Sequence, residues 1–487
     1  MDYKKYLASA WAWPITYKVV ALIILLLIFD PNSKIAAILF LIVAAVGFIK
    51  FLFGENDEET EEGFRRGARL VPPKQLQVMI SKSKDATAIQ LGLIKIPTSL
   101  EPKHFLFVGG TSSGKSLAFN QSLESSRARG CRAIVVDLNG HALSKFYRKD
   151  KDFILNPFDG RSEKWSPFSE IKSEYHIDSI TKSLVPDGEG ADKTWNGYAQ
   201  NIVAAVLGSM LVQGRTSNGE FYNKLILDST SDLAELVQGT PAQRDFEKLD
   251  TAKLNNTLSI ISSQISSFKY LPKDADKNSF SIRNWVHDAG DSWIFINARD
   301  DQLDALKPLI GAWLDIVISS LLSTEPLPAN SNKLTHFFID EIASFQIQSL
   351  DSLLTKSRKF GGSCFAGLQT ISQLQATYGH YQSQTLLSNF SSKLILRQND
   401  SATSEYFSKN LGNREIMRTV EGGSDGEKSS TSYSDQITQE QIVMPSELTN
   451  LPDRVGYLNL AGNYPITKIQ IQLPKPFTSV AEPFIYK

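Results

Sequence analysis

The stretch FLFVGGTSSGKSLAF (residues 105–119) passes from an apolar strand pattern through a glycine-rich loop into a helix pattern. Its central part fits the phosphate-binding consensus G-x-x-x-x-G-K-[ST]. Glycine lets backbone N–H groups turn inward around a phosphate, and the following helix directs its positive end at the same charge. The stretch therefore predicts a nucleotide site, whose binding loop consists of Gly109, Gly110, Thr111, Ser112, Ser113, Gly114, Lys115 and Ser116.

A second strand pattern, THFFIDE (335–341), ends in Asp340 and Glu341. In an ATP site, Lys115 reaches the β- and γ-phosphate oxygens, and Ser116 ligates Mg²⁺. Asp340 can hold the same Mg²⁺ through a water molecule, and Glu341 is placed to polarise the attacking water, which is the base that hydrolysis needs. Acidic pairs also cap many strands, so this assignment depends on Lys115 being in the same chain.

Two further polar residues are candidates for this chemistry. Gln369 ends the strand pattern SCFAGLQ (363–369), where its amide can sense the γ-phosphate or orient the water. The alternative is a hydrogen bond at a turn. Arg358, in LLTKSRKFGG (353–362), suits the transition-state charge on a neighbouring subunit's ATP. Charged pairs at helix ends are otherwise usually solvated.

Apolar strand patterns recur with helical stretches between them, which predicts a doubly wound α/β domain with the ligand at the carboxyl ends of the strands. The surplus of chain near residues 180–290 has helical periodicity and predicts an inserted all-α domain, which either contacts a polymer or packs as a lid. Residues 421–436 lack apolar content and predict a mobile loop. The strands are expected at 104–109, 132–137, 292–297, 335–340, 363–368 and 393–397.

The amino-terminal region contains two apolar segments, residues 11–29 and 35–53, joined by DPNSK. Each is just long enough to cross a bilayer, which takes roughly 20 helical residues. Basic residues precede and follow the pair, so the positive-inside rule predicts a hairpin with both termini in the cytoplasm. The alternative is a cleaved signal peptide followed by a buried helix. Residues 55–62 are rich in acids and predict a solvated linker.

The composition of the chain excludes few classes of function. The net charge of −1 gives no global sign of nucleic-acid binding, although a ring lumen can be locally basic in a neutral protein. Cys131 and Cys364 lie beside or within apolar runs, with neither disulfide nor metal spacing, and the histidines lack ligand spacing. We divide the chain into a transmembrane hairpin (1–54), an acidic linker (55–64), a nucleotide-binding domain in two parts (65–181 and 291–487) and the inserted all-α domain (182–290).

With these motifs in place, the chain resembles the coupling proteins of type IV secretion and conjugation systems, most closely their TrwB/TraD branch. The resemblance covers nearly all of the chain after the apolar segments. The stretches that carry it are RRGARLV (65–71), GGTSSGKS (109–116), VVDLNGHALSKFY (135–147), ILNPFDGRSEKW (154–165), FFIDE (337–341), LLTKSRKFGGSCFAGLQTISQLQATYG (353–379) and LPDRVGYLNLAG (451–462).

The resemblance implies a membrane-anchored, RecA-like motor ATPase, stimulated by DNA, that assembles as a homohexamer in the bacterial inner membrane. It implies that the all-α domain faces single- or double-stranded DNA without strong sequence preference. It also implies delivery of a relaxase-bound single strand to the proteins of a secretion channel. The family's phosphate and magnesium positions fall on Lys115 and Ser116, its acidic pair on Asp340 and Glu341, its later glutamine on Gln369 and its candidate arginine finger on Arg358.

The five-residue loop between the apolar segments is much shorter than is usual in the family. Two other readings stay open at this point. One is a DNA translocase of the FtsK/HerA kind, which shares the core but has different motifs around the acids. The other is a receptor that docks protein substrates on a secretion channel, with ATP serving assembly.

Overall fold

The computed structural model describes residues 64–487 except 84, 189–191, 249, 289, 329–332, 425–429 and 475–477. The predicted hairpin and all but the last residue of the predicted linker therefore lie outside the described residues. The chain divides into two units, one formed by residues 1–64 and 416–436 and the other by residues 65–415 and 437–487.

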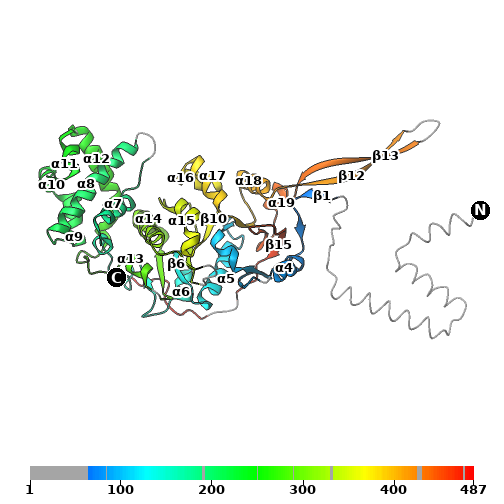
Figure 1. Cartoon of the computed structure of the whole chain (residues 1–487), viewed down its shortest axis with the longest axis horizontal. Coiled ribbons are helices and arrows are strands. Elements are labelled where there is room, and N and C mark those ends of the chain that lie inside the picture. The colour runs from blue at the N-terminus through cyan, green and yellow to red at the C-terminus, as the bar shows by residue number, and fades with distance from the viewer. Residues whose placement is uncertain are drawn as a thin grey trace, which may run out of the picture. The chain divides into compact units, whose positions relative to one another are not determined.

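The second unit is built on one ten-stranded sheet, in which Figure 1 labels β6, β10 and β15. The strand order is β2–β15–β14–β11–β5–β10–β9–β6–β8–β7. The strands from β11 to β7 run parallel, whereas β14 is antiparallel to both of its neighbours. The bounds are β2 (Leu70–Val71), β5 (Phe105–Val108), β6 (Arg132–Leu138), β7 (Phe153–Ile154), β8 (Trp293–Ala298), β9 (Thr335–Ile339), β10 (Gly362–Leu368), β11 (Ser392–Leu396), β14 (Val455–Asn459) and β15 (Ile466–Gln470).

All six predicted strands are present, as β5, β6, β8, β9, β10 and β11. Strand β5 is buried on both faces, as expected of a central parallel strand. Leu106 and Val108 join the apolar core that includes Trp313 of helix α14 (Asp300–Leu322). Phe105 and Phe107 face the other core, under helix α5 (Lys115–Ala128). Helices thus cover both faces of the sheet, which confirms the predicted doubly wound α/β fold.

Helix α14 is the one helix among the described residues that is long and apolar enough to cross a membrane, and 72% of its most apolar window is buried. Its apolar residues lie against the sheet, so it is a core helix. The remaining helices around the sheet are α4 (Pro73–Lys82), α6 (His141–Phe146), α15 (Leu350–Lys356), α16 (Ile371–Tyr378), α17 (His380–Asn389), α18 (Ser401–Leu411) and α19 (Pro445–Thr449), with the 3₁₀ turns η1 (Thr98–Lys103) and η5 (Ser357–Phe360). A hairpin of β3 (Thr87–Leu91) and β4 (Ile94–Pro97) contacts α5.

The elements between β7 and β8 are helical. Helix α7 packs on α14 and on α8, and α8 packs on α12. The predicted boundary at residue 182 falls within α7, and the division into domains stays a prediction. The bounds are α7 (Glu174–Leu184), α8 (Asp192–Val212), α9 (Asn218–Tyr222), α10 (Thr230–Leu236), α11 (Pro241–Lys248), α12 (Thr251–Ile265) and α13 (Ile282–His287), with η2 (Pro167–Glu170), the π-helical turn η3 (Asn223–Leu227) and η4 (Ser266–Tyr270).

The prediction of a mobile loop at 421–436 is wrong for the residues that the structure describes there. They belong to strands β12 (Asn413–Ser424) and β13 (Ser430–Gln441), which form a three-stranded sheet with β1 (Phe64–Gly67). The Thr419 hydroxyl donates to the Asp435 carboxylate across the two strands, at 2.8 Å. The strands contain serine, threonine and tyrosine, of which threonine and tyrosine favour β structure. Backbone hydrogen bonds and cross-strand side-chain pairs can hold two strands together without many apolar residues, so low apolar content did not predict a loop correctly here.

Candidate nucleotide site

The binding loop follows β5 at the carboxyl edge of the sheet. Its backbone is held by both neighbouring strands, because the Gly109 amide donates to the Leu368 carbonyl at 3.0 Å and the Gly110 amide donates to the Arg397 carbonyl at 2.9 Å. A Cβ on Gly110 would lie 2.6 Å from the Asn399 amide nitrogen, so a larger residue would displace that side chain. Gly114, with φ of +104°, turns the chain into α5.

The loop opens into a cavity of about 690 Å³. Lys115 and Ser116 reach this cavity from α5, Asp340 and Glu341 from the end of β9, and Gln369 from the end of β10. Parallel strands present their carboxyl ends at one edge, so residues more than 220 positions apart meet here. Five of the six residues predicted to act on the phosphates, the magnesium or the water therefore line one cavity. The loop residues Gly110, Thr111, Ser112 and Gly114 also line it.

Lys115 and Glu341 form an ion pair, with 2.9 Å between the ammonium nitrogen and one carboxylate oxygen. The side chains are 10% and 12% exposed. Burial raises the pKa of Glu341, and the charge of Lys115 opposes that rise. The lysine predicted to bind phosphate is thus bonded to the residue predicted to activate water, and a phosphate competes with Glu341 for it.

Several polar atoms in this region are buried without a hydrogen-bond partner among the described residues. They include one carboxylate oxygen each of Asp340 and Glu341, and the Ser113 hydroxyl. At the end of β6, burial raises the pKa of Asp137 to about 6, and the nearby charge of Asp340 adds to the rise. The unpartnered oxygens of Asp340 and Glu341 suit a cation or the water molecules around it.

Magnesium is usually held by one or two protein oxygens, with water and substrate phosphates completing its shell. Ser116 and Asp340 fit that requirement. Among the described residues there is no group of three or more His, Cys, Asp or Glu side chains that could hold a metal without such help. The donor set therefore suits Mg²⁺ delivered together with a nucleotide.

Arg358 does not line this cavity. It lies in η5, immediately before β10, and therefore at the amino edge of the sheet, opposite the binding loop. It lines a different cavity of about 1170 Å³, together with Arg129, Lys356 and Lys359. Within one chain, Arg358 and the nucleotide site are separated by the length of the parallel strands.

The sequence prediction missed Arg454. Its φ of +66° is unusual for arginine, and its backbone amide donates to the Ser113 carbonyl at 2.9 Å. The Arg454 backbone also lies against Gly114, where a Cβ would come within 3.0 Å of the arginine Cα. Nothing in the local sequence LPDRVGY indicates a contact with the binding loop, because that contact depends on β14 lying two strands from β5.

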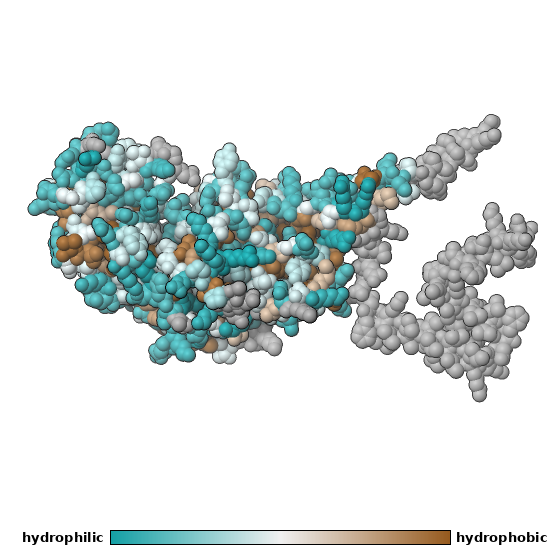
Figure 2. Space-filling model, viewed as in Figure 1, coloured by the Kyte–Doolittle hydropathy of each residue, from teal (hydrophilic) through white to brown (hydrophobic). Residues whose placement is uncertain are grey.

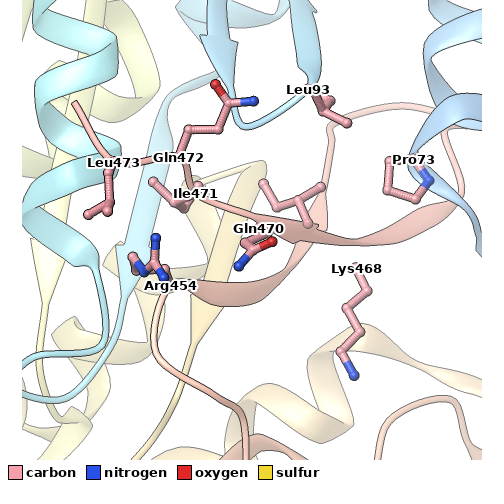
Figure 3. Close-up of a pocket in the computed structure, with 9 residues that line it drawn as sticks. Pro73, Leu93, Arg454, Lys468, Gln470, Ile471, Gln472 and Leu473 are labelled. Carbon is pink, nitrogen blue, oxygen red and sulfur yellow. The ribbon is translucent and has the colours of Figure 1, made fainter. Parts of the chain in front are cut away.

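Arg454 lines the nucleotide cavity and also a second cavity of about 490 Å³. Figure 3 shows Leu93 and Pro73 across this second cavity from Arg454, with Ile471 beside the arginine. The acidic pair lies on the β9 side of the binding loop, and this second cavity lies on the β15 side. A phosphate chain bound to the loop with its γ-phosphate toward Glu341 would thus extend its other end toward Arg454.

A family model described as "Type IV secretion-system coupling protein DNA-binding domain" matches residues 88–472. The coupling protein TraD of Escherichia coli (strain K12) is 25% identical over 451 residues, which is 90% of this chain and 62% of TraD. The chain therefore spans less than two thirds of the length of this relative.

Solved structures of the bacterial conjugative coupling protein TrwB lacking its first 70 residues are also similar to the chain. The unbound form has a TM-score of 0.79 at 33% identity, covering 87% of this chain and 96% of the solved chain. TrwB in complex with ADP and Mg²⁺ has a TM-score of 0.77 at 33% identity, covering 88% of this chain and 98% of the solved chain.

Proposed function

This chain belongs to the family of type IV secretion-system coupling proteins, and on that premise we propose that it is an ATP-driven motor of conjugation. In this proposal, six copies form a ring that takes a relaxase-bound DNA strand and pumps single-stranded DNA toward a secretion channel. The observation that carries the proposal is the cavity in which Lys115, Ser116, Asp340, Glu341 and Gln369 come together.

Each of these side chains has one task. Lys115 leaves Glu341 and binds the β- and γ-phosphates of ATP, which frees the carboxylate to accept a proton from water. Ser116 and Asp340 hold Mg²⁺, which supplies positive charge to the phosphate oxygens when bound. Gln369 donates its amide hydrogens to the γ-phosphate or to the water. The complex of TrwB with ADP and Mg²⁺ supports this assignment of cofactors.

Arg358 acts on a neighbouring copy. Because the arginine lies at the sheet edge opposite its own nucleotide, it can contribute to hydrolysis only across a subunit boundary. An arginine finger supplied in this way stabilises the negative charge of the transferring phosphoryl group. The ring is thus a requirement of the chemistry, since a single chain contains an incomplete site.

Arg454 and the second cavity hold the nucleoside end of ATP. The guanidinium can lie against the face of a base, with the apolar side chains of Ile471, Leu93 and Pro73 enclosing it. These groups present a flat cation and apolar surface, which favours binding of a base by stacking.

We further propose that residues 1–54 anchor the chain in the inner membrane as a two-helix hairpin, with both termini in the cytoplasm. Lys4 and Lys5 before the hairpin and Arg65, Arg66 and Arg69 after it support this orientation. The helical elements between β7 and β8 form the inserted domain, and the description of the matching family as DNA-binding supports a DNA contact by this chain.

The test is ATP hydrolysis by the full chain in detergent, over a range of protein concentrations, with no DNA, single-stranded DNA or double-stranded DNA. We expect specific activity to rise with concentration and to rise further with DNA, which bridges subunits. The Lys115→Ala variant is the control for contaminating ATPases. Specific activity that is independent of concentration and indifferent to DNA would contradict the motor and favour a docking receptor.

A further inference from the structure

The helical elements between β7 and β8 contain a groove of about 1280 Å³ that the nucleotide chemistry does not use. It runs between the start of α7, the second half of α8, and α10. Its floor is apolar and includes Ile177, Ala204, Gly208, Leu211 and Leu236. Figure 2 shows apolar residues exposed among polar ones over α8 to α10, and Val212, at the end of α8, is 89% exposed.

Acidic side chains form the rim of this groove. Glu174 and Asp178 line it from α7, and Asp228, Asp232 and Glu235 line it from the segment that ends in α10. The groove therefore has an acidic rim on both walls. No ion pair of Glu174, Asp178 or Glu235 is found in the described part of the chain.

The cations that line the groove are engaged by neighbours. Lys224 is paired with Asp228, Arg215 with Glu220 at 3.2 Å, and Lys172 donates to the Asn284 side chain. Five carboxylates and three cations line the groove, which leaves a local charge of −2. An apolar floor between acidic walls matches one kind of surface, which is apolar on one side and positively charged along its edges.

We propose that this groove binds a cationic amphipathic helix of a protein partner. Such a helix places its apolar residues, spaced three and four apart, on the floor, and its lysines and arginines reach the carboxylates on the walls. The groove exceeds the range of about 300–1,000 Å³ that is typical of small-molecule pockets. A nucleic acid is disfavoured, because its phosphates would meet the acidic rim and two of the three lining cations, Lys224 and Arg215, are already in ion pairs.

One residue of the groove floor, Gly208, can be substituted so that the groove is filled. A Cβ built on Gly208 would meet only Ile177, at 3.7 Å, so the position tolerates a side chain that extends into the groove. Gly208 is in helix α8, where a residue with better helix propensity stabilises. The substitution Gly208→Leu therefore fills the floor without removing any contact of the folded protein.

The probe is a labelled 16-residue helical peptide with leucines on one face and lysines on the other, titrated with the full chain in detergent and followed by fluorescence anisotropy. We expect binding with a Kd of about 10 µM or tighter, weakened about tenfold or more by Gly208→Leu. The double variant Glu174→Lys, Asp178→Lys should weaken binding by a similar factor through charge alone. ATP hydrolysis by Gly208→Leu should equal that of the parent, and its thermal midpoint should be at least as high, because leucine has the better helix propensity.

Two controls separate the groove from unspecific attraction. Glu405→Lys changes an exposed acid on α18 outside the groove and should leave peptide binding unchanged. A peptide with glutamate in place of lysine should not bind. The proposal is overturned if no cationic peptide binds, if Gly208→Leu binds as tightly as the parent, or if single-stranded DNA displaces the peptide, since DNA would then be the occupant.

Discussion

Replacing Glu341 by glutamine should tighten ATP binding while nearly abolishing hydrolysis. In the parent, ATP must take Lys115 away from a carboxylate at 2.9 Å, and both side chains are about nine-tenths buried. A hydrogen bond between charged groups is worth about 1.5–3 kcal/mol, and glutamine removes the charged part of that competition. We therefore expect the Kd for ATP to fall by about tenfold, which corresponds to about 1.4 kcal/mol.

The same substitution removes the group that accepts the proton from water. General-base catalysis contributes about 10²–10⁴-fold to a rate, so turnover should fall by at least about 10²-fold. Without nucleotide, the variant leaves Lys115 buried beside a neutral partner, and its free energy of unfolding should be lower than that of the parent. Saturating ATP should therefore raise the thermal midpoint of the variant more than that of the parent.

Three measurements test this account: titration with a fluorescent ATP analogue, phosphate release at saturating ATP, and thermal unfolding with and without nucleotide. Asp300→Asn is the matched control, because Asp300 lines the same cavity and is not paired with Lys115. The control removes one negative charge from the cavity but should not tighten binding to the same degree. Weaker ATP binding by Glu341→Gln, or hydrolysis at the parent rate, would refute the reasoning.

Three further predictions follow from the geometry. Arg358→Ala and Lys115→Ala should each be nearly inactive, but a mixture should recover phosphate release, because some boundaries then join an intact loop to an intact arginine; no recovery would exclude a shared site. Arg454→Ala should raise the Kd for ATP by about tenfold while Lys468→Ala, which changes only the second cavity, has a smaller effect in the same titration. Burial raises the pKa of Asp315 to about 6 from its ordinary 3.8. Between about pH 4 and 6, the folded state therefore holds a proton on Asp315 that the unfolded state has already released. The free energy of unfolding should therefore fall by up to about 3 kcal/mol as the pH rises through that window. In Asp315→Asn, the thermal midpoint should depend less on pH over the same window. An equal pH dependence of the thermal midpoint in both proteins would contradict this prediction.

The nucleotide site could be predicted because its residues follow strands whose patterns are strong on their own. The strand FLFV and the loop after it carry both the apolar signal and the glycine spacing. Asp340, Glu341 and Gln369 were predicted by the same rule, since a polar residue that ends a buried parallel strand must face the loop edge. The roles of these residues stay predictions, but their meeting in one cavity is observed.

Arg454 could not be predicted, because its contact depends on strand order. No local pattern shows that the antiparallel strands β14 and β15 continue the sheet beyond β11 and bring residue 454 against Gly114. The strands β12 and β13 were missed for a different reason. Their sequence has almost no apolar alternation, and recognising a strand from sequence depends on that alternation.

The position of β5 in the sheet also determines how long this strand lacks its partners while the chain is being translated. This strand pairs with β10 and β11, whose residues leave the ribosome roughly 250 or more positions later. At about 5–20 residues per second, β5 waits on the order of 10–50 seconds for either partner. During that interval both of its edges offer free backbone groups beside an apolar surface. The strands of the nascent chain can therefore pair wrongly during most of translation. The yield of folded protein in the cell should depend on chaperones and on translation speed more strongly than its final stability suggests.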